Sequence, residues 1–240
     1  MRQSVGGSGR GDNFREGGGG GERYRPGRYE PAGYYERLRR YRLAVAVLLL
    51  SVIMIFVALT SAYIVRAGMG TYDTVTHSYV YDWKPVQLPN ELLLLNTLVL
   101  VLSSGTLEMA RRNLNARAVT AGLTGLPGVA VEPERSAPWL GITLVLGMAF
   151  LAGQFLAWRE LRSQGMFLAT NPSSSFFYVL TGAHAAHLIG GLVALFYAAF
   201  ATVFGKSLAT RRIVVDAAGW YWHFMGALWI YIFALLHFGK

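Results

Sequence analysis

Long apolar stretches alternate with polar segments along most of this chain. Five of the stretches reach the roughly 20 residues that an α-helix needs to cross a hydrocarbon layer about 30 Å thick. The expected helices lie near residues 43–65, 92–110, 139–158, 176–204 and 217–238. Because the first of them is apolar on every side, the pattern predicts an all-α integral membrane protein with five transmembrane helices.

Composition supports a membrane protein and excludes much of redox chemistry. Hydrophobic residues make up 53% of the 240 residues and charged residues only 15%, against roughly 25% charged residues in a typical soluble domain. The chain contains no cysteine, so it cannot form a disulfide, an iron–sulfur site, a thioether-linked haem or a thiolate-ligated copper centre. The first 42 residues hold no apolar core of the kind a secretion signal needs, so we expect the first helix to act as the targeting signal.

The amino-terminal segment differs from the rest. Residues 1–42 are basic and rich in Gly, Arg and Tyr, and part of the formal charge of +9 comes from them. We predict a disordered cytoplasmic tail here, followed by one membrane domain over residues 43–240. Arg-Gly segments with interleaved aromatic residues can bind single-stranded nucleic acid. However, the arginines lie directly against the first helix, where they fix orientation and attract acidic headgroups, so no nucleic acid partner is expected.

Positive charge also predicts the orientation. Lys and Arg concentrate in the tail, in the connection 111–137 and in the connection around Lys206. With five spans these segments fall on one side, which puts the amino terminus in the cytoplasm and the carboxyl terminus outside. The long polar connection 111–137 also suggests a hinge between two helices before it and three after it.

Histidines are the first candidates for function, because ionisable groups at membrane depth are costly. His184 and His187 are three residues apart in the fourth helix, so they share one face. His223 and His237 are 14 residues apart in the fifth helix, but the facing pairs that two haems would need are missing. A single haem between the fourth helix and His237 remains an alternative. No carboxylate accompanies His184 and His187, so hydrogen bonding to helices, lipid or a partner subunit is favoured over a metal site.

Several motifs resemble subunit III of the haem-copper cytochrome c oxidases and related quinol oxidases. The principal matches are NPSSSFFYVLTGAHAAHLIGGL in the fourth helix and DAAGWYWHFMGALW in the fifth. Supporting matches are SVIMIFVALTSAY, LPNELLLLNTLVLVLSSGT and LGMAFLAGQFLAW. They follow the family's order from about Leu43 to the end of the chain.

The resemblance implies a five-helix bundle like that of the shorter bacterial members, arranged as two helices plus three with a V-shaped cleft that holds phospholipid. It implies no redox centre and no catalytic residue in this chain, because haem and copper belong to partner subunits. Subunits I and II are the expected partners, with a small subunit IV or a larger respiratory supercomplex as further options. The complex would pass electrons from cytochrome c, or from quinol, to oxygen while moving protons across a bacterial-type inner membrane.

The resemblance also implies a set of lipid-binding or inter-subunit residues. These residues are Trp83, His184, His187, Asp216, Trp222 and His223. Three positions depart from the family, since Val52, Ala157 and Gly226 stand where the family commonly has a carboxylate. An unpaired buried acid costs several kcal/mol, so the joint loss suggests a changed shared environment.

Two other functions remain open at this level. A relative of subunit III could accompany a nitric oxide reductase, for which the missing carboxylates would be natural. A small membrane protein could also bind one haem and act alone. The copper content of a purified complex distinguishes a nitric oxide reductase from an oxidase. A Soret absorbance from the isolated chain would identify a haem-binding protein that acts alone.

Overall fold

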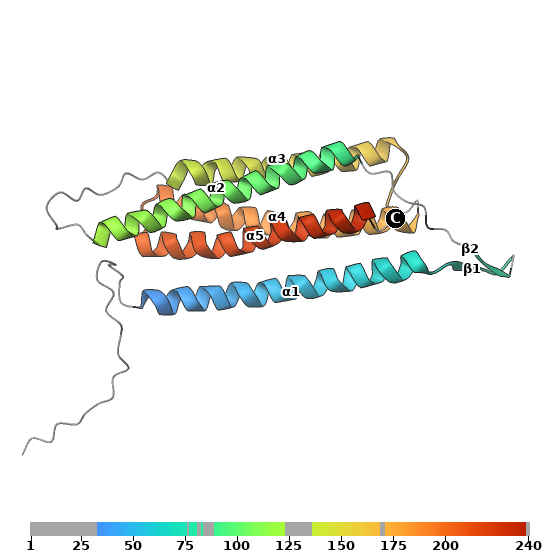
Figure 1. Ribbon diagram of the computed structural model, residues 1–240, viewed down its shortest axis with the longest axis horizontal. Coiled ribbons are helices and arrows are strands. Elements are labelled where there is room, and N and C mark those ends of the chain that lie inside the picture. Colours follow the sequence, from blue (N-terminus) through green and yellow to red (C-terminus); the bar gives the residue numbers. More distant parts are fainter. Residues whose placement is uncertain are drawn as a thin grey trace, which may run out of the picture.

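Five long helices dominate the computed structural model, which describes residues 33–75, 77–80, 83, 89–122, 136–168 and 171–238 (Figure 1). All five are long and apolar enough to cross a membrane, so the predicted all-α membrane fold is confirmed. The helices are α1 (Tyr34–Gly68), α2 (Asn90–Gly122), α3 (Ser136–Ser163), α4 (Pro172–Val203) and α5 (Leu208–Phe238). The predicted disorder of the tail up to residue 32 lies outside the described residues.

The helices extend beyond the predicted apolar stretches. α1 begins at Tyr34 rather than near Leu43, so the last part of the expected tail is helical. α2 continues to Gly122 through residues that were predicted to be a polar connection. The polar extension is helical because Glu108 pairs with arginines three and four residues further on, at positions 111 and 112, a spacing that stabilises helices.

α4 begins with a well-formed amino-terminal cap. The Asn171 side chain accepts a hydrogen bond from the Ser174 backbone N–H at 2.8 Å, and the Ser174 hydroxyl accepts one from the Asn171 backbone N–H at 3.3 Å. Pro172 occupies the first helical turn, where a missing N–H costs nothing. The Asn-Pro turn therefore starts the helix about one turn earlier than hydropathy alone suggested.

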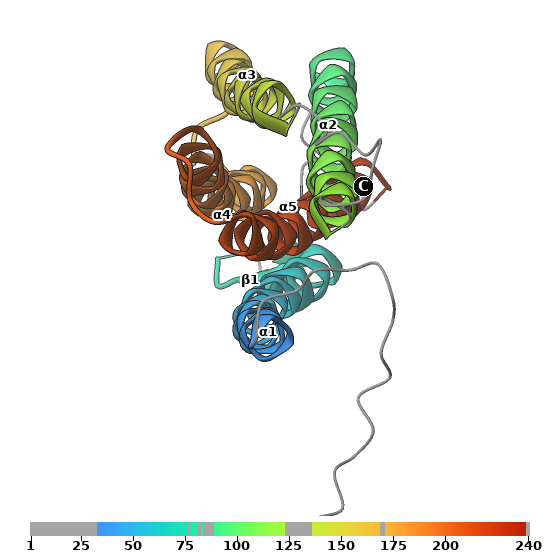
Figure 2. The same ribbon diagram turned by 90° about the vertical axis from the view of Figure 1, so that its left-hand side faces the viewer.

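Four of the helices form a bundle, and α1 lies outside it. α2 packs against α3 and α5, and α4 packs against α3 and α5, so these helices form a closed ring. α1 packs only on α5 and α4 among the described elements, as Figure 2 shows. The predicted grouping of two helices plus three is therefore corrected to four helices plus one, because α1 and α2 do not pack together. We call α2–α5 the four-helix bundle.

Polar side chains pair with one another inside the four-helix bundle. The indole N–H of Trp222 donates to Ser103 Oγ at 2.7 Å, and that of Trp229 donates to Thr97 Oγ1 at 3.0 Å. At Gly153 the helices α2 and α3 approach so closely that an added Cβ would lie 1.9 Å from Asn96 Oδ1. Small residues and hydroxyls of this kind let transmembrane helices approach and bond to one another.

A small antiparallel hairpin lies within the long connection between α1 and α2. Strands β1 (Thr71–Asp73) and β2 (Ser78–Val80) pair in register, with Tyr72 opposite Tyr79. His77, in the turn, has a φ of 52°, a left-handed conformation that few residues other than glycine adopt. The hairpin projects beyond the ends of the helices (Figure 1).

Candidate functional site

Charged residues from three helices meet at one end of the molecule. The Asp216 carboxylate of α5 accepts hydrogen bonds from Arg42 of α1 at 2.8 and 3.2 Å and from Arg111 of α2 at 3.3 Å. Asp216 was expected just before the last helix, but it lies inside α5 and only 8% of its surface is exposed. We call this group of three residues the clasp, since it joins α1 to the four-helix bundle.

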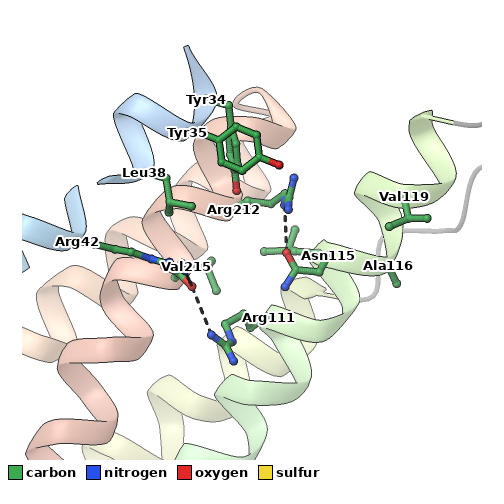
Figure 3. Close-up of a pocket in the computed structure, with 12 residues that line it drawn as sticks. Tyr34, Tyr35, Leu38, Arg42, Arg111, Asn115, Ala116, Val119, Arg212 and Val215 are labelled. Carbon is green, nitrogen blue, oxygen red and sulfur yellow. Dashed lines mark hydrogen bonds and ion pairs between the residues drawn. The ribbon is translucent and has the colours of Figure 1, made fainter. Parts of the chain in front are cut away.

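A cavity of about 510 Å³ lies beside the clasp, between the ends of α1, α2 and α5. Its charged lining residues are Arg42, Arg111, Arg212 and Asp216, so positive charge exceeds negative charge. Figure 3 shows Arg212 reaching from α5 to Asn115 of α2, where its Nε donates to the amide oxygen at 3.1 Å. The same guanidinium lies 4.9 Å from the ring centre of Tyr34. An excess of cationic donors in a cavity is suited to a phosphate or carboxylate.

A second, apolar hollow adjoins this cavity along α1. It has a volume of about 650 Å³ and lies between α1 and the Trp220 and Phe224 side chains of α5. Tyr35, Leu38 and Arg42 line both the hollow and the charged cavity. The two spaces are therefore neighbours, and the first is lined by cationic side chains whereas the second is mainly apolar.

The two histidines of α4 occupy different environments. His184 is fully buried, and its ring lies against Phe150 and Trp229 at 5.9 and 5.2 Å between ring centres. His187 is half-buried, its Nδ1 is 2.7 Å from the Ala183 carbonyl of its own helix, and its ring contacts Phe56 of α1. His184 is thus enclosed by its own chain, whereas His187 lies at the junction with α1.

The other expected site residues are scattered. Trp222 is buried at the centre of the four-helix bundle, and Trp83 is half-buried against Tyr63 and Phe176 at the opposite end from the clasp. His223 is exposed on α5. The structure therefore brings the six expected residues into no single site. Asp216 alone among them lines the charged cavity.

The pocket arginines are the functional candidates that sequence reasoning missed. Arg42 and Asp216 are 174 residues apart in the chain, and Arg111 and Asp216 are 105 apart. Arg42 and Arg111 stood out in the sequence only as part of basic segments. The signal that the sequence offered for this cluster was a single acidic residue at the start of the last helix, together with several arginine-rich helix ends.

Two of the three positions that lack a carboxylate lie in the packed interior, and the third, Gly226, is half-buried. Val52 and Ala157 belong to the apolar core and are 3% and 0% exposed. At Gly226 an added Cβ would lie 3.6 Å from Ser104 Oγ. An acid at position 52 or 157 would be buried among apolar side chains. Burying an unpaired acid costs free energy, which explains why apolar residues suit both positions.

The side chains that could bind a metal ion are dispersed over the described residues. No group of three His, Asp or Glu side chains within the described part of the chain is placed to hold a metal. The aromatic rings around His184 leave no facing ligand, and the His187 ring bonds to its own helix.

The fold defines a multi-pass α-helical membrane protein, and a cavity lined by three arginines and one aspartate lies at one end of its helices. The family model described as "Cytochrome c oxidase subunit III" matches residues 34–239. The match covers all five helices, so this chain belongs to the cytochrome c oxidase subunit III family.

Individual relatives agree with the family match. The chain is 31% identical over 189 residues to "Cytochrome c oxidase subunit 3" of Synechocystis sp., which covers 77% of this chain and 73% of the relative. It is 36% identical over 103 residues to "Probable cytochrome c oxidase subunit 3" of Mycobacterium tuberculosis, and 34% identical over 100 residues to the protein of the same name from Nocardia farcinica. Each of the latter two matches covers 42% of this chain and 49% of the relative. These matches thus span about half the length of the relatives.

Proposed function

We propose that this chain is the non-redox accessory subunit III of a respiratory haem-copper terminal oxidase. The observation that carries the proposal is the family match over residues 34–239. In this role the chain packs against subunit I in a complex with subunit II and stabilises it, while subunit I holds the haems and a copper ion and reduces oxygen. The complex takes electrons from cytochrome c and moves protons, and this chain contributes packing and bound lipid.

The proposed membrane is a bacterial-type inner membrane, with the clasp on the cytoplasmic side. Arg42, Arg111 and Arg212 all lie at that end of the helices, and arginine-rich helix ends favour the cytoplasmic side. The carboxyl end of α5 then lies on the outer side, together with the hairpin β1–β2.

The proposed lipid is an anionic phospholipid bound along α1. Its phosphate would enter the charged cavity near Arg111 and Arg212, and an acyl chain would follow the adjoining apolar hollow past Leu43, Leu50 and Phe224. The support for this arrangement is that the two spaces share the lining residues Tyr35, Leu38 and Arg42, and that arginines outnumber acids in the first. The position of α1 outside the four-helix bundle provides the room for an acyl chain.

Purification with partner subunits tests the accessory role. The chain carries a carboxyl-terminal tag and is purified in mild detergent, and subunits, haem, copper and oxygen uptake with reduced cytochrome c are measured. We expect a complex that contains haem and copper and consumes oxygen. A chain purified alone, a copper-free complex that reduces nitric oxide, or haem bound to the isolated chain would each overturn the proposal.

Lipid analysis of the same complex tests the binding site. Arg212→Gln removes a cavity arginine that lies outside the clasp, and we expect at least a fivefold loss of co-purified anionic phospholipid by mass spectrometry. Arg112→Gln is the matched control, because Arg112 pairs with Glu108 and does not line the cavity. Equal lipid content in the two variants would contradict the proposed site.

A further inference from the structure

Two polar side chains in the interior of the four-helix bundle have no hydrogen-bond partner among the described residues. Gln154 of α3 is 1% exposed, and neither its amide nitrogen nor its amide oxygen is bonded. His184 of α4 is 0% exposed, and neither of its ring nitrogens is bonded. Because an unpaired polar group is costly to bury, nearly all such groups in proteins have a partner, which is either protein or ordered water.

Contacts on either side place the two side chains in one layer of the bundle. Phe150 and Trp158 lie four residues before and after Gln154 on α3, so the three share one face. The Phe150 ring lies 5.9 Å from the His184 ring between ring centres. The Trp158 indole donates to Thr181 Oγ1 at 3.0 Å, one turn before His184 on α4. Gln154 and His184 therefore approach the same point between α3 and α4, yet no hydrogen bond joins them.

The donors of the neighbouring polar side chains are already bonded elsewhere. The ring of Trp229 lies 5.2 Å from that of His184 between ring centres, but its N–H donates to Thr97 Oγ1 at 3.0 Å. The Thr181 hydroxyl donates to the Phe177 carbonyl at 2.7 Å. These contacts leave the bundle without a side chain that pairs with both groups, which points to a partner outside the chain.

The missing partner must both donate and accept hydrogen bonds. The Gln154 amide carries N–H donors and an oxygen acceptor, and a neutral imidazole carries one donor and one acceptor. Water has both functions, and a buried water typically makes about three hydrogen bonds to otherwise unpaired groups. Ala157, one turn from Gln154, and Ala185, next to His184, are both buried and have short side chains. Short side chains in this layer favour room for one water molecule.

We propose that Gln154 and His184 bind one internal water molecule, which bridges α3 to α4 inside the four-helix bundle. The Gln154 amide N–H donates to the water oxygen, and the water donates to the unprotonated ring nitrogen of His184. This bridge continues toward the centre of the membrane the connection that Trp158 and Thr181 make one turn away. The assignment follows from the packing of α3 against α4 and does not depend on the proposed function.

Solid-state NMR of the purified, lipid-reconstituted protein with isotope-labelled histidine tests the assignment. The signal that disappears in His184→Phe identifies the His184 ring. We expect a cross-peak between water protons and this ring in the wild type, and at least a fivefold weaker cross-peak in Gln154→Leu, whose apolar side chain cannot hold the water. Gln164→Leu is the matched control, because Gln164 is exposed and bonds to Glu160, and it should keep the full cross-peak.

A density map that resolves ordered water gives a second readout on the wild-type protein. We expect density for one water within hydrogen-bond distance of both the Gln154 amide and the His184 ring. A direct hydrogen bond between the two side chains, or a layer without water density, would overturn the assignment. So would a cross-peak that stays unchanged in Gln154→Leu. A released water regains its hydrogen bonds in bulk solvent, so the bridge contributes little net stability and the water itself is the readout.

Discussion

α1 and the four-helix bundle are held in place by different kinds of contact. Inside the bundle, indole and hydroxyl groups form buried hydrogen bonds at several depths, and glycine permits the close approach of α2 and α3. α1 buries one stripe of side chains, and its strong polar contact is the clasp at one end. In a membrane, apolar packing between helices is only weakly favoured over packing against lipid. α1 is therefore the helix that separates most easily from the four-helix bundle.

The largest expected effect comes from adding a side chain inside the bundle. Gly153→Ala places a Cβ 1.9 Å from Asn96 Oδ1, so Asn96 must move and lose its bond to the Phe150 carbonyl. We expect a loss of unfolding free energy of about 3 kcal/mol, near the upper part of the range for overpacked cores. Thermal unfolding of the purified complex measures it.

Gly141→Ala is the control for that change, because nothing lies within 4 Å of a Cβ at Gly141 on the same helix. Alanine favours helix over glycine, so this variant should be unchanged or slightly more stable. Equal melting temperatures for the two variants would contradict the close approach of α2 and α3.

The next largest effect should come from the clasp. Asp216→Ala leaves Arg42 and Arg111 without their shared carboxylate, and we expect a cost of about 2 kcal/mol, below the range for fully buried pairs because both arginines are partly exposed. Protease protection of α1 in the purified complex should fall, while the bundle stays intact. Glu36→Gln serves as the control, since its pair with Arg40 is exposed, and a similar loss of protection there would argue against the clasp.

A smaller effect is expected from one buried hydrogen bond of the bundle. Ser103→Ala leaves the indole N–H of Trp222 unpaired, at a cost of about 1 kcal/mol. A double-mutant cycle of melting temperatures with Trp222→Phe isolates the pair. If the stability losses of the two single variants add up to the loss of the double variant, the hydrogen bond contributes nothing to stability.

The smallest expected effect concerns His184. Its ring is buried between aromatic rings, and neither nitrogen has a hydrogen-bond partner among the described residues. His184→Phe removes two unpaired polar atoms and keeps the ring, so stability should stay within about 0.5 kcal/mol or rise slightly. A loss of more than 2 kcal/mol in unfolding free energy would show that the imidazole has a hydrogen-bond partner outside the described residues.

Hydropathy predicted the five spans, because the length of an apolar stretch determines whether its helix can cross a membrane. It missed the helical ends at Tyr34 and Gly122, since these extensions are polar and depend on pairing at Glu108 and on packing outside the hydrocarbon layer. The division into two helices plus three was inferred from the long connection after Arg111. Connection length does not determine which helices pack together, and α1 in fact contacts α5 and α4.

The candidate site was less accessible to sequence reasoning. The residues Trp83, His184 and Trp222 stood out by type and motif, but only packing shows that they line no common cavity. The clasp joins residues that are more than 100 positions apart, and no local pattern encodes such a pairing. Asp216 was identified by its position, whereas its partners were not.

The clasp as the anchor of α1 is tested most directly by a distance measurement between spin labels. The chain has no cysteine, so labels at Val47→Cys on α1 and Val203→Cys on α4, both exposed, can be introduced without background. Double electron–electron resonance should give a narrow distance distribution that broadens when Asp216→Ala is added. A distribution that stays equally narrow with Asp216→Ala would contradict the account.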